Sequence, residues 1–222
     1  VIDRTCREKN TSLEIIQNDD IIISKVDKKG TYFYYSSLEI ELPLFGDHQV
    51  QNCSLAICLS KYALGAAVSP SKIKTAISKS IWKGRLEKIS NNNLFYDVAH
   101  NYDGVKAMLN TINVLYPDKK KVGLFCIKSD KNILAICKLL KNNFKKLIVC
   151  SDKNGYLVKV SDLLGIMNEN NIECLSVDSV EEGVSLLNEY NNPNYLNLIF
   201  GSHYIASEVY GSIGKYFDRT YN

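Results

Sequence analysis

An acid, an imidazole and an amide follow one another closely in the stretch LFYDVAHNYDG, residues 94–104. Asp97, His100 and Asn101 could make polar contacts to a ligand, and three residues suited to a buried strand precede them. A helix-like pattern comes next, so we expect a strand end, a polar loop and a helix start. In a doubly wound sheet, ligands bind beyond such strand ends. The alternative is that Asp97 or Asn101 only caps the helix, a contribution of about 1 kcal/mol.

The elements that would position this stretch alternate along the chain from Leu94 onward. Apolar runs predict strands, and apolar residues at helical spacing predict helices between them. The strands are expected at 94–96, 122–127, 146–150, 172–177 and 195–200, and the helices at 104–115, 133–140, 160–167, 180–189 and 205–216. Such apolar strands indicate an α/β, Rossmann-like domain with a mainly parallel sheet and helices on both faces.

The chain before Leu94 has a different character. Strands are predicted at 21–25, 31–35 and 38–44, and helices at 48–64 and 71–78. These elements make a thin α/β unit that looks like the last part of a domain. We therefore expect one domain over 1–80, a joining hinge over 81–93 that ends in three asparagines, and a second domain over 94–222.

Composition narrows the function classes. The net charge of +3 is too small to suggest nucleic acid, and no basic patch is interleaved with aromatic residues. Seven cysteines include no C-x-x-C pair, and most lie in apolar stretches. A disulfide framework or zinc site is therefore not expected, and the pattern favours a reducing cytoplasm. No apolar stretch approaches the length of a membrane span.

Five short motifs occur in one order along the chain. They are PLFGDHQVQN (43–52), WKGRLEKI (82–89), FYDVAHNYDG (95–104), SDKN (129–132) and GSHYIASEV (201–209). Together they resemble the folylpolyglutamate synthase and dihydrofolate synthase family, which are ATP-dependent ligases related to the muramyl peptide ligases. The resemblance runs from about Leu42 to the end of the chain. It implies that 1–80 is the end of a truncated central ATPase domain and that 94–222 is a glutamate-binding domain of the Mur ligase type.

The resemblance also implies residues on the nucleotide side of the site. Asn52 should contact the adenine side of ATP, and Arg85 should reach the phosphates, where a guanidinium binds in a bidentate manner. Asp97 should take the ribose or its surroundings, and His100 should line the same side. The alternatives are that Asn52 is an ordinary exposed helix residue and that Arg85 is a surface ion-pair partner.

Two further residues are implied on the glutamate side. Lys131 and Ser202 should hold the incoming glutamate, because a carboxylate needs a cation and hydroxyl or backbone donors. Ser202 precedes the helix expected from Ile205, whose N-terminus would favour an anion. The alternatives are a solvated helix-start lysine and a simple N-cap serine.

The sequence also departs from the family pattern. Val98 replaces the usual glycine and Tyr102 the usual proline, so the path of this loop is expected to differ. Asn132 stands where the family has a second acid, and Lys128 stands where small or apolar residues are usual. These two changes bear on amino-acid specificity more than on fold.

No glycine-rich lysine loop of the form G-x-x-x-x-G-K-[ST] occurs in the 222 residues. The resemblance implies that this loop, the Mg²⁺ ligands and most of the pterin site lie before Val1. We therefore expect the C-terminal part of a monomeric ligase that uses ATP and Mg²⁺ to add glutamate to dihydropteroate, to folate or to both. This part is expected to be inactive alone, and no catalytic residue is assigned in it. The alternatives are a non-catalytic nucleotide- or amino-acid-binding module and another ligase of the Mur type.

Overall fold

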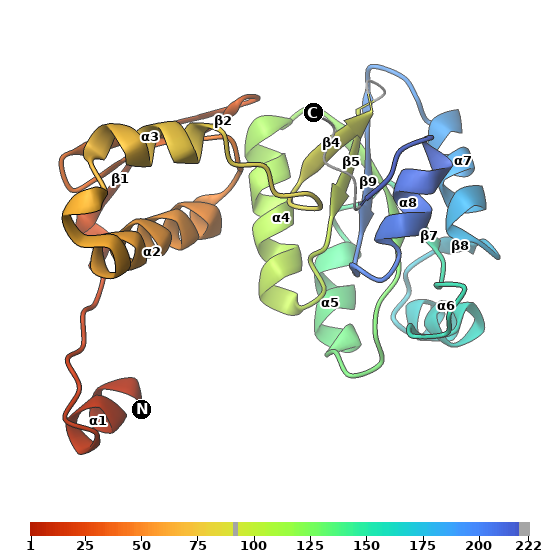
Figure 1. Cartoon of the computed structure of the whole chain (residues 1–222). Helices are drawn as coiled ribbons and strands as arrows, with labels where there is room; N and C mark the ends of the chain where they lie inside the picture. The colour runs from red at the N-terminus through yellow and green to blue at the C-terminus, as the bar shows by residue number, and fades with distance from the viewer. Residues whose placement is uncertain (91–92, 218–222) are drawn as a thin grey trace. The chain divides into compact units, whose positions relative to one another are not determined.

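A computed structural model describes residues 1–90 and 93–217, and its chain forms two compact units (Figure 1). Unit 1 comprises Val1–Pro43 and Asp47–Ser80, and unit 2 comprises Leu44–Gly46 and the chain from Ile81 onward. Residues 91 and 92 of the predicted hinge, and 218–222 of the predicted second domain, lie outside the described residues. Within the described ranges, no helix is long and apolar enough to cross a membrane.

Unit 1 is built on an antiparallel sheet with the strand order β1-β2-β3. Its elements are α1 (Ile2–Glu8), η1 (Asn18–Asp20), β1 (Ile21–Asp27), β2 (Gly30–Tyr35), β3 (Leu38–Leu42), α2 (Asp47–Leu64), η2 (Gly65–Ala67) and α3 (Pro70–Ser78). The predicted strands and the two longer helices are present. Phe33 and Ile40 of the sheet are fully buried, and Val50 and Ile57 of α2 are only 1% and 2% exposed. This small core holds α2 on the sheet.

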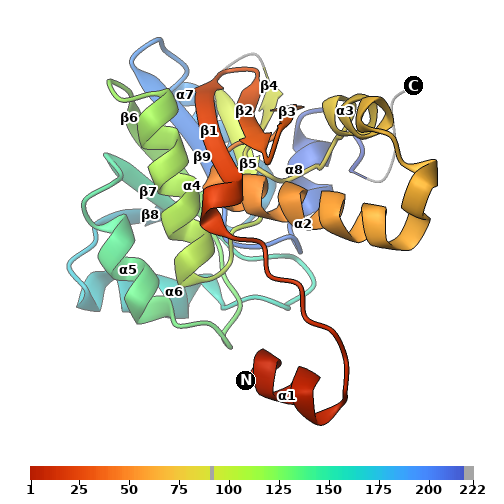
Figure 2. The ribbon, with the colours of Figure 1, turned by 90° about the vertical axis from the view of Figure 1, so that its left-hand side faces the viewer.

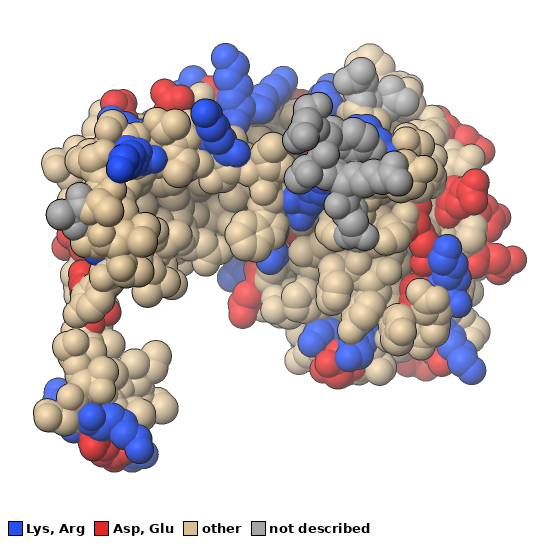
Figure 3. Space-filling view, viewed as in Figure 1, with Lys and Arg blue, Asp and Glu red and all other residues tan. Residues whose placement is uncertain are grey.

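The helix ends of unit 1 follow from their residue types. α3 begins at Pro70, one residue earlier than predicted, because proline suits the first helical position. The helix α1 was not predicted, since it has no buried residue and therefore no apolar periodicity. Figure 3 shows side chains of both signs on α1, in agreement with the ion pairs between Arg7 and Asp3 at 2.8 Å and between Arg4 and Glu8 at 3.4 Å.

Unit 2 contains a six-stranded sheet with the order β4-β5-β9-β6-β7-β8. Its elements are β4 (Glu87–Ser90), β5 (Leu94–Asp97), α4 (Tyr102–Leu115), β6 (Lys120–Phe125), α5 (Ile133–Leu140), β7 (Lys146–Val149), α6 (Val160–Glu169), β8 (Cys174–Ser176), α7 (Val180–Glu189), β9 (Tyr195–Phe200) and α8 (Ala206–Ser212). All strand pairs are parallel except the edge pair β4–β5. The prediction of a mainly parallel α/β sheet is confirmed.

Helices cover both faces of this sheet, as predicted. One buried cluster joins strand residues such as Phe125 and Phe200 to α4, α5 and α6, and Figure 2 shows α4 and α5 together on one side. A second cluster joins residues such as Leu124 and Ile199 to α7 and α8. Successive residues of β6 and β9 therefore enter opposite clusters, which explains why these strands read as continuous apolar runs.

The last helix is shorter than predicted. The sequence favoured a helix over 205–216, but α8 ends at Ser212. Gly214 has a φ of +70°, and the N–H of Lys215 returns to the carbonyl oxygen of Tyr210 at 2.8 Å. A left-handed glycine with such a returning hydrogen bond is the usual way in which a helix ends.

Candidate functional site

The carboxyl ends of three neighbouring strands form the candidate site of unit 2. β9 pairs in parallel with β5 on one side and with β6 on the other. The loops that follow these strands therefore leave the same edge of the sheet, where α/β folds bind ligands. Four of the predicted residues, Asp97, His100, Lys131 and Ser202, lie at these strand ends or in these loops.

The carboxylate of Asp97 connects two backbone segments. Its Oδ2 accepts a hydrogen bond from the N–H of Leu86 at 2.8 Å, and its Oδ1 accepts one from the N–H of Ala99 at 2.7 Å. Asp97 is 7% exposed. Burial raises the pKa of its carboxyl to about 6, against the opposing effect of the two N–H groups and the nearby charges of Arg85 and His100. Asp97 thus ties the segment of Arg85 to the loop of His100.

This geometry separates the two alternatives for the start of α4. The helix is capped by Asn101, whose Oδ1 accepts a hydrogen bond from the N–H of Gly104 at 2.8 Å. Asp97 does not cap it. Each oxygen of Asp97 accepts one backbone hydrogen bond and can accept another, so the contact to ribose that the resemblance implies stays a prediction.

The segment of Arg85 is part of unit 2 and is fixed there by hydrogen bonds of the neighbouring Gly84. The N–H of Gly84 donates to Oε2 of Glu87 at 2.9 Å, and its carbonyl oxygen accepts from the N–H of Val98 at 2.9 Å. Gly84 has a φ of +71°, and a Cβ there would lie 2.8 Å from Cγ1 of Val98. Glycine is therefore required at this position. Arg85 is half-buried, and its charge acts to lower the pKa of Asp97.

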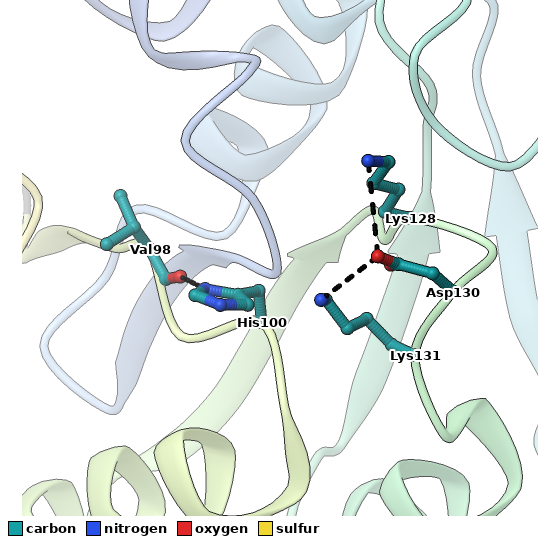
Figure 4. Close-up of polar contacts among 5 residues, drawn as sticks. All are labelled: Val98, His100, Lys128, Asp130 and Lys131. Carbon is teal, nitrogen blue, oxygen red and sulfur yellow. Dashed lines mark hydrogen bonds and ion pairs between the residues drawn. The ribbon is translucent and has the colours of Figure 1, made fainter.

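The imidazole of His100 is oriented by its own loop. Its Nδ1 lies 2.9 Å from the carbonyl oxygen of Val98 (Figure 4). Because a carbonyl oxygen only accepts, Nδ1 carries the proton of this hydrogen bond. The neutral ring then has Nε2 available as an acceptor, and the protonated ring has it as a donor. His100 can thus meet either an amino or hydroxyl group or an anion of a substrate.

Lys131 lies in a small charged loop after β6. Its Nζ is 3.3 Å from Oδ2 of Asp130, and the Nζ of Lys128 is 4.0 Å from the same oxygen. Figure 4 shows the Lys131 side chain extending toward Asp130 on the side where the His100 ring lies. One carboxylate therefore serves two ammonium groups, and the loop retains an excess positive charge.

Ser202 is buried, with 3% of the residue exposed. Its Oγ accepts a hydrogen bond from the N–H of Tyr204 at 3.0 Å, and its carbonyl oxygen accepts one from the hydroxyl of Tyr96 at 2.8 Å. The hydroxyl hydrogen of Ser202 remains able to donate. The following helix begins at Ala206, not at Ile205, and has seven residues. Its N-terminus is therefore a weaker argument for an anion at Ser202 than the sequence suggested.

Asn52 belongs to the other unit. It is exposed on α2, and its Nδ2 lies 3.4 Å from Oε1 of Gln49. Gln49 is buried and contacts the ring of His48 at 3.1 Å. The structure brings Arg85 and the four residues named above into unit 2, whereas Asn52 lies in unit 1.

An aromatic cluster beside the site was not predicted from the sequence. The ring of Tyr204 lies 4.3 Å from that of His203 and 5.1 Å from that of Tyr156, measured between centroids. The Nζ of Lys128 is 6.0 Å from the centre of the Tyr204 ring. Each of these residues follows a predicted strand by a few positions, and that spacing was the signal available in the sequence.

The described residues do not fit a magnesium site. Over 1–90 and 93–217, no group of three His, Cys, Asp or Glu side chains could hold a metal ion. We therefore derive no reaction step through a metal. All seven cysteines are free thiols. A nucleotide phosphate or an amino-acid carboxylate fits better, because Arg85, Lys131 and His100 supply cationic or donor groups on unit 2.

Comparison with known proteins identifies the same region. Residues 84–203 match the family described as "Mur ligase, glutamate ligase domain". The folylpolyglutamate synthase of Lacticaseibacillus casei is 32% identical over 180 residues, which is 77% of this chain and 40% of that protein. The chain thus spans less than half the length of this curated relative.

Solved structures share the fold. A folylpolyglutamate synthase of Mycobacterium tuberculosis, complexed with ADP and AMPPCP, superposes with a TM-score of 0.83 and 20% identity. That match covers 100% of this chain and 53% of the other. E. coli FolC in complex with DHPP and ADP gives a TM-score of 0.78 at 21% identity and covers 96% of this chain and 50% of the other.

Proposed function

Because this chain belongs to the Mur ligase family through its glutamate ligase domain, we propose that it forms the amino-acid-receiving part of an ATP-dependent ligase. The ligase adds glutamate to dihydropteroate, to a folate or to both. The observation that carries this proposal is the group of cationic and donor side chains at the ends of β5 and β6, namely His100, Lys128 and Lys131. A relative named folylpolyglutamate synthase supports the choice of substrates.

The proposed reaction has two balanced steps. The γ-phosphoryl group of ATP passes to a carboxylate oxygen of the pterin substrate, and ADP leaves. The amino nitrogen of glutamate, after losing a proton, attacks the acyl carbon. A C–N bond forms, the bond between the acyl carbon and the phosphate oxygen breaks, and inorganic phosphate leaves with the second proton of the nitrogen. Holding the amine beside the acyl phosphate supplies much of the rate, since positioning replaces a bimolecular encounter.

The residues of unit 2 take separate parts in these steps. Arg85 binds the phosphates, where its planar guanidinium matches two oxygens. Lys131 holds a carboxylate of glutamate, and the hydroxyl of Ser202 donates to it. His100 presents Nε2 to a substrate donor because Nδ1 is engaged by the carbonyl of Val98. Asp97 keeps Arg85 and His100 in register through its two backbone hydrogen bonds. In unit 1, Asn52 faces the adenine.

We also propose that the 222-residue chain does not ligate by itself. It spans 40% of the L. casei relative, and its sequence holds no glycine-rich lysine loop for the phosphates. Phosphoryl transfer relies on such backbone amides, a lysine and Mg²⁺ to stabilise developing charge. The free thiols are consistent with a reducing cytoplasm, and the working form is proposed to be a monomer.

The test uses the product of the entire open reading frame that encodes this chain. Arg85→Ala should lower kcat/KM for glutamate-dependent ATP hydrolysis by on the order of 10²-fold, as the loss of one charge-stabilising donor does in other enzymes. Arg4→Ala is the matched control, because Arg4 lies on α1 and pairs only weakly with Glu8 at the surface. Near-normal turnover of Arg85→Ala would contradict the assignment. Amino-acid binding without turnover in the unmodified protein would favour a non-catalytic binding module.

A further inference from the structure

Building on the proposed function, we propose that Lys128 and Lys131 form a subsite for the side-chain carboxylate of the incoming amino acid. Before the ligand arrives, Asp130 pairs weakly with both lysines. The subsite selects an acidic amino acid over its amide. Lys128 is not one of the positions at which the resemblance implies a substrate contact, and Asp130 acts here as an internal competitor of the ligand.

The geometry of the loop brings the two lysines together. Oδ2 of Asp130 lies 3.3 Å from the Nζ of Lys131 and 4.0 Å from that of Lys128, so the two ammonium groups converge on one oxygen (Figure 4). The N–H of Lys131 donates to the carbonyl oxygen of Lys128 at 3.2 Å, which closes the turn. Two cations that converge on one carboxylate oxygen can also converge on the carboxylate of a ligand.

The loop carries a net positive charge. Lys128 and Lys131 carry two positive charges, and Asp130 supplies one negative charge. Asn132, at the position where the resembled family has a second acid, is neutral. Its Oδ1 accepts a hydrogen bond from the N–H of Ala135 at 3.1 Å and so caps α5. One positive charge is therefore left for an anion. Asn132 caps the helix but, unlike an acid at that position, does not cancel this charge.

The charged side chains of the loop are accessible to a ligand. The side chains of Lys128, Asp130 and Lys131 are 44%, 53% and 28% exposed. Ion pairs at such exposure are weak, so a ligand carboxylate can replace Asp130 at little cost. The ring of Tyr204 lies beside Lys128 and bounds the subsite, with its centre 6.0 Å from Nζ. The N–H of Tyr204 also donates to Oγ of Ser202. Tyr204 thus connects the subsite to the serine that is proposed to hold glutamate.

The test is a titration of the product of the entire open reading frame, in which amide shifts are followed in ¹H–¹⁵N NMR spectra. L-glutamate, L-glutamine and inorganic phosphate are added at matched ionic strength, because salt screens exposed charges. Glutamate should shift the amides of 128–131 and of Tyr204 and bind about tenfold more tightly than glutamine, the value expected for one charge-assisted contact. Over the same concentration range, phosphate should not bring the shifts of these amides to saturation.

Three variants should change the affinity for glutamate, two of them by lowering it and one by raising it. Lys128→Met and Lys131→Met should each weaken glutamate binding about tenfold without changing glutamine binding. Asp130→Asn should tighten glutamate binding several-fold, since the ligand no longer competes with an internal carboxylate. A general loss of structure could not produce that gain. The matched controls are Lys138→Met on α5 and Asp118→Asn in the turn before β6, both exposed, and neither should change the affinity.

The proposal is overturned if glutamate and glutamine bind equally, if the loop amides do not shift, or if phosphate binds there more tightly than glutamate. It is also overturned if Asp130→Asn weakens glutamate binding. These outcomes are distinct from failure of the proposed function. Loss of ligation by the whole reading-frame product would reject the ligase, whereas unchanged preference for glutamate in an active Lys128→Met ligase would reject only the subsite.

Discussion

Replacing Asp97 by asparagine should change how the stability of unit 2 depends on pH. The carboxyl of Asp97 is buried, and burial raises its pKa from 3.8 to about 6. At about 1.4 kcal/mol per pKa unit, this difference corresponds to about 3 kcal/mol of unfolding free energy. Asparagine has nearly the shape of the protonated carboxyl but does not titrate, so it isolates this contribution.

The sign follows from the order of the two pKa values. The folded-state pKa lies above the unfolded-state pKa, so the stability that the protonated Asp97 contributes is fully present below about pH 3.8 and is lost as the pH rises through about 6. The unfolding free energy of the wild type should therefore fall relative to that of Asp97→Asn by about 3 kcal/mol across this window. Above it, the difference should be constant.

The assay is urea unfolding at a series of pH values, followed by NMR signals from β5 and β9. Signals from unit 2 are needed because a chain of two compact units need not unfold in one step. The nearby charge of His100 acts to lower the pKa of Asp97. The comparison is therefore repeated with His100→Asn in both proteins. Parallel pH profiles for wild type and Asp97→Asn would refute the reasoning.

The remaining predictions concern two glycine-to-alanine substitutions and one buried hydroxyl group. For each variant, the free energy of unfolding is measured in urea. Gly201→Ala should destabilise by about 3 kcal/mol or more, because φ is +113° and the new Cβ would lie 1.7 Å from the carbonyl oxygen of Cys126; wild-type stability would show that this turn relaxes. Gly165→Ala, where nothing lies within 4 Å of the new Cβ, is the matched control and should stabilise α6 by about 0.5–1 kcal/mol. Tyr96→Phe should cost about 1–2 kcal/mol, because its hydroxyl donates to the carbonyl oxygen of Ser202; no loss would mean that this hydrogen bond contributes nothing net.

The strands buried on both faces were predictable, and the edge strand was not. β6 and β9 appear in the sequence as apolar runs because helices cover both sides of the sheet. β4 lies at the edge, and its Glu87 and Lys88 are partly or fully exposed. Such a strand has no apolar run to detect, and it was assigned to the hinge.

The polar residues of the site were predictable by type, but their contacts were not. Asp97 was found as an acid at a strand end, yet one of its two partners is the backbone N–H of Leu86, eleven positions earlier. Side-chain types do not reveal where a backbone N–H points. The contact between Lys128 and Tyr204 depends on β9 lying next to β6, and hydrophobic periodicity does not give strand order.

The most direct measurement of the central claim is ligation itself. The product of the entire reading frame is incubated with ATP, Mg²⁺, L-glutamate and either dihydropteroate or tetrahydrofolate, and products are identified by mass spectrometry. The account predicts a pterin product that carries one more glutamate, formed with equal amounts of ADP and phosphate, and none from the 222-residue chain alone. Absence of this product with both pterins, from a protein that binds ATP, would contradict the account.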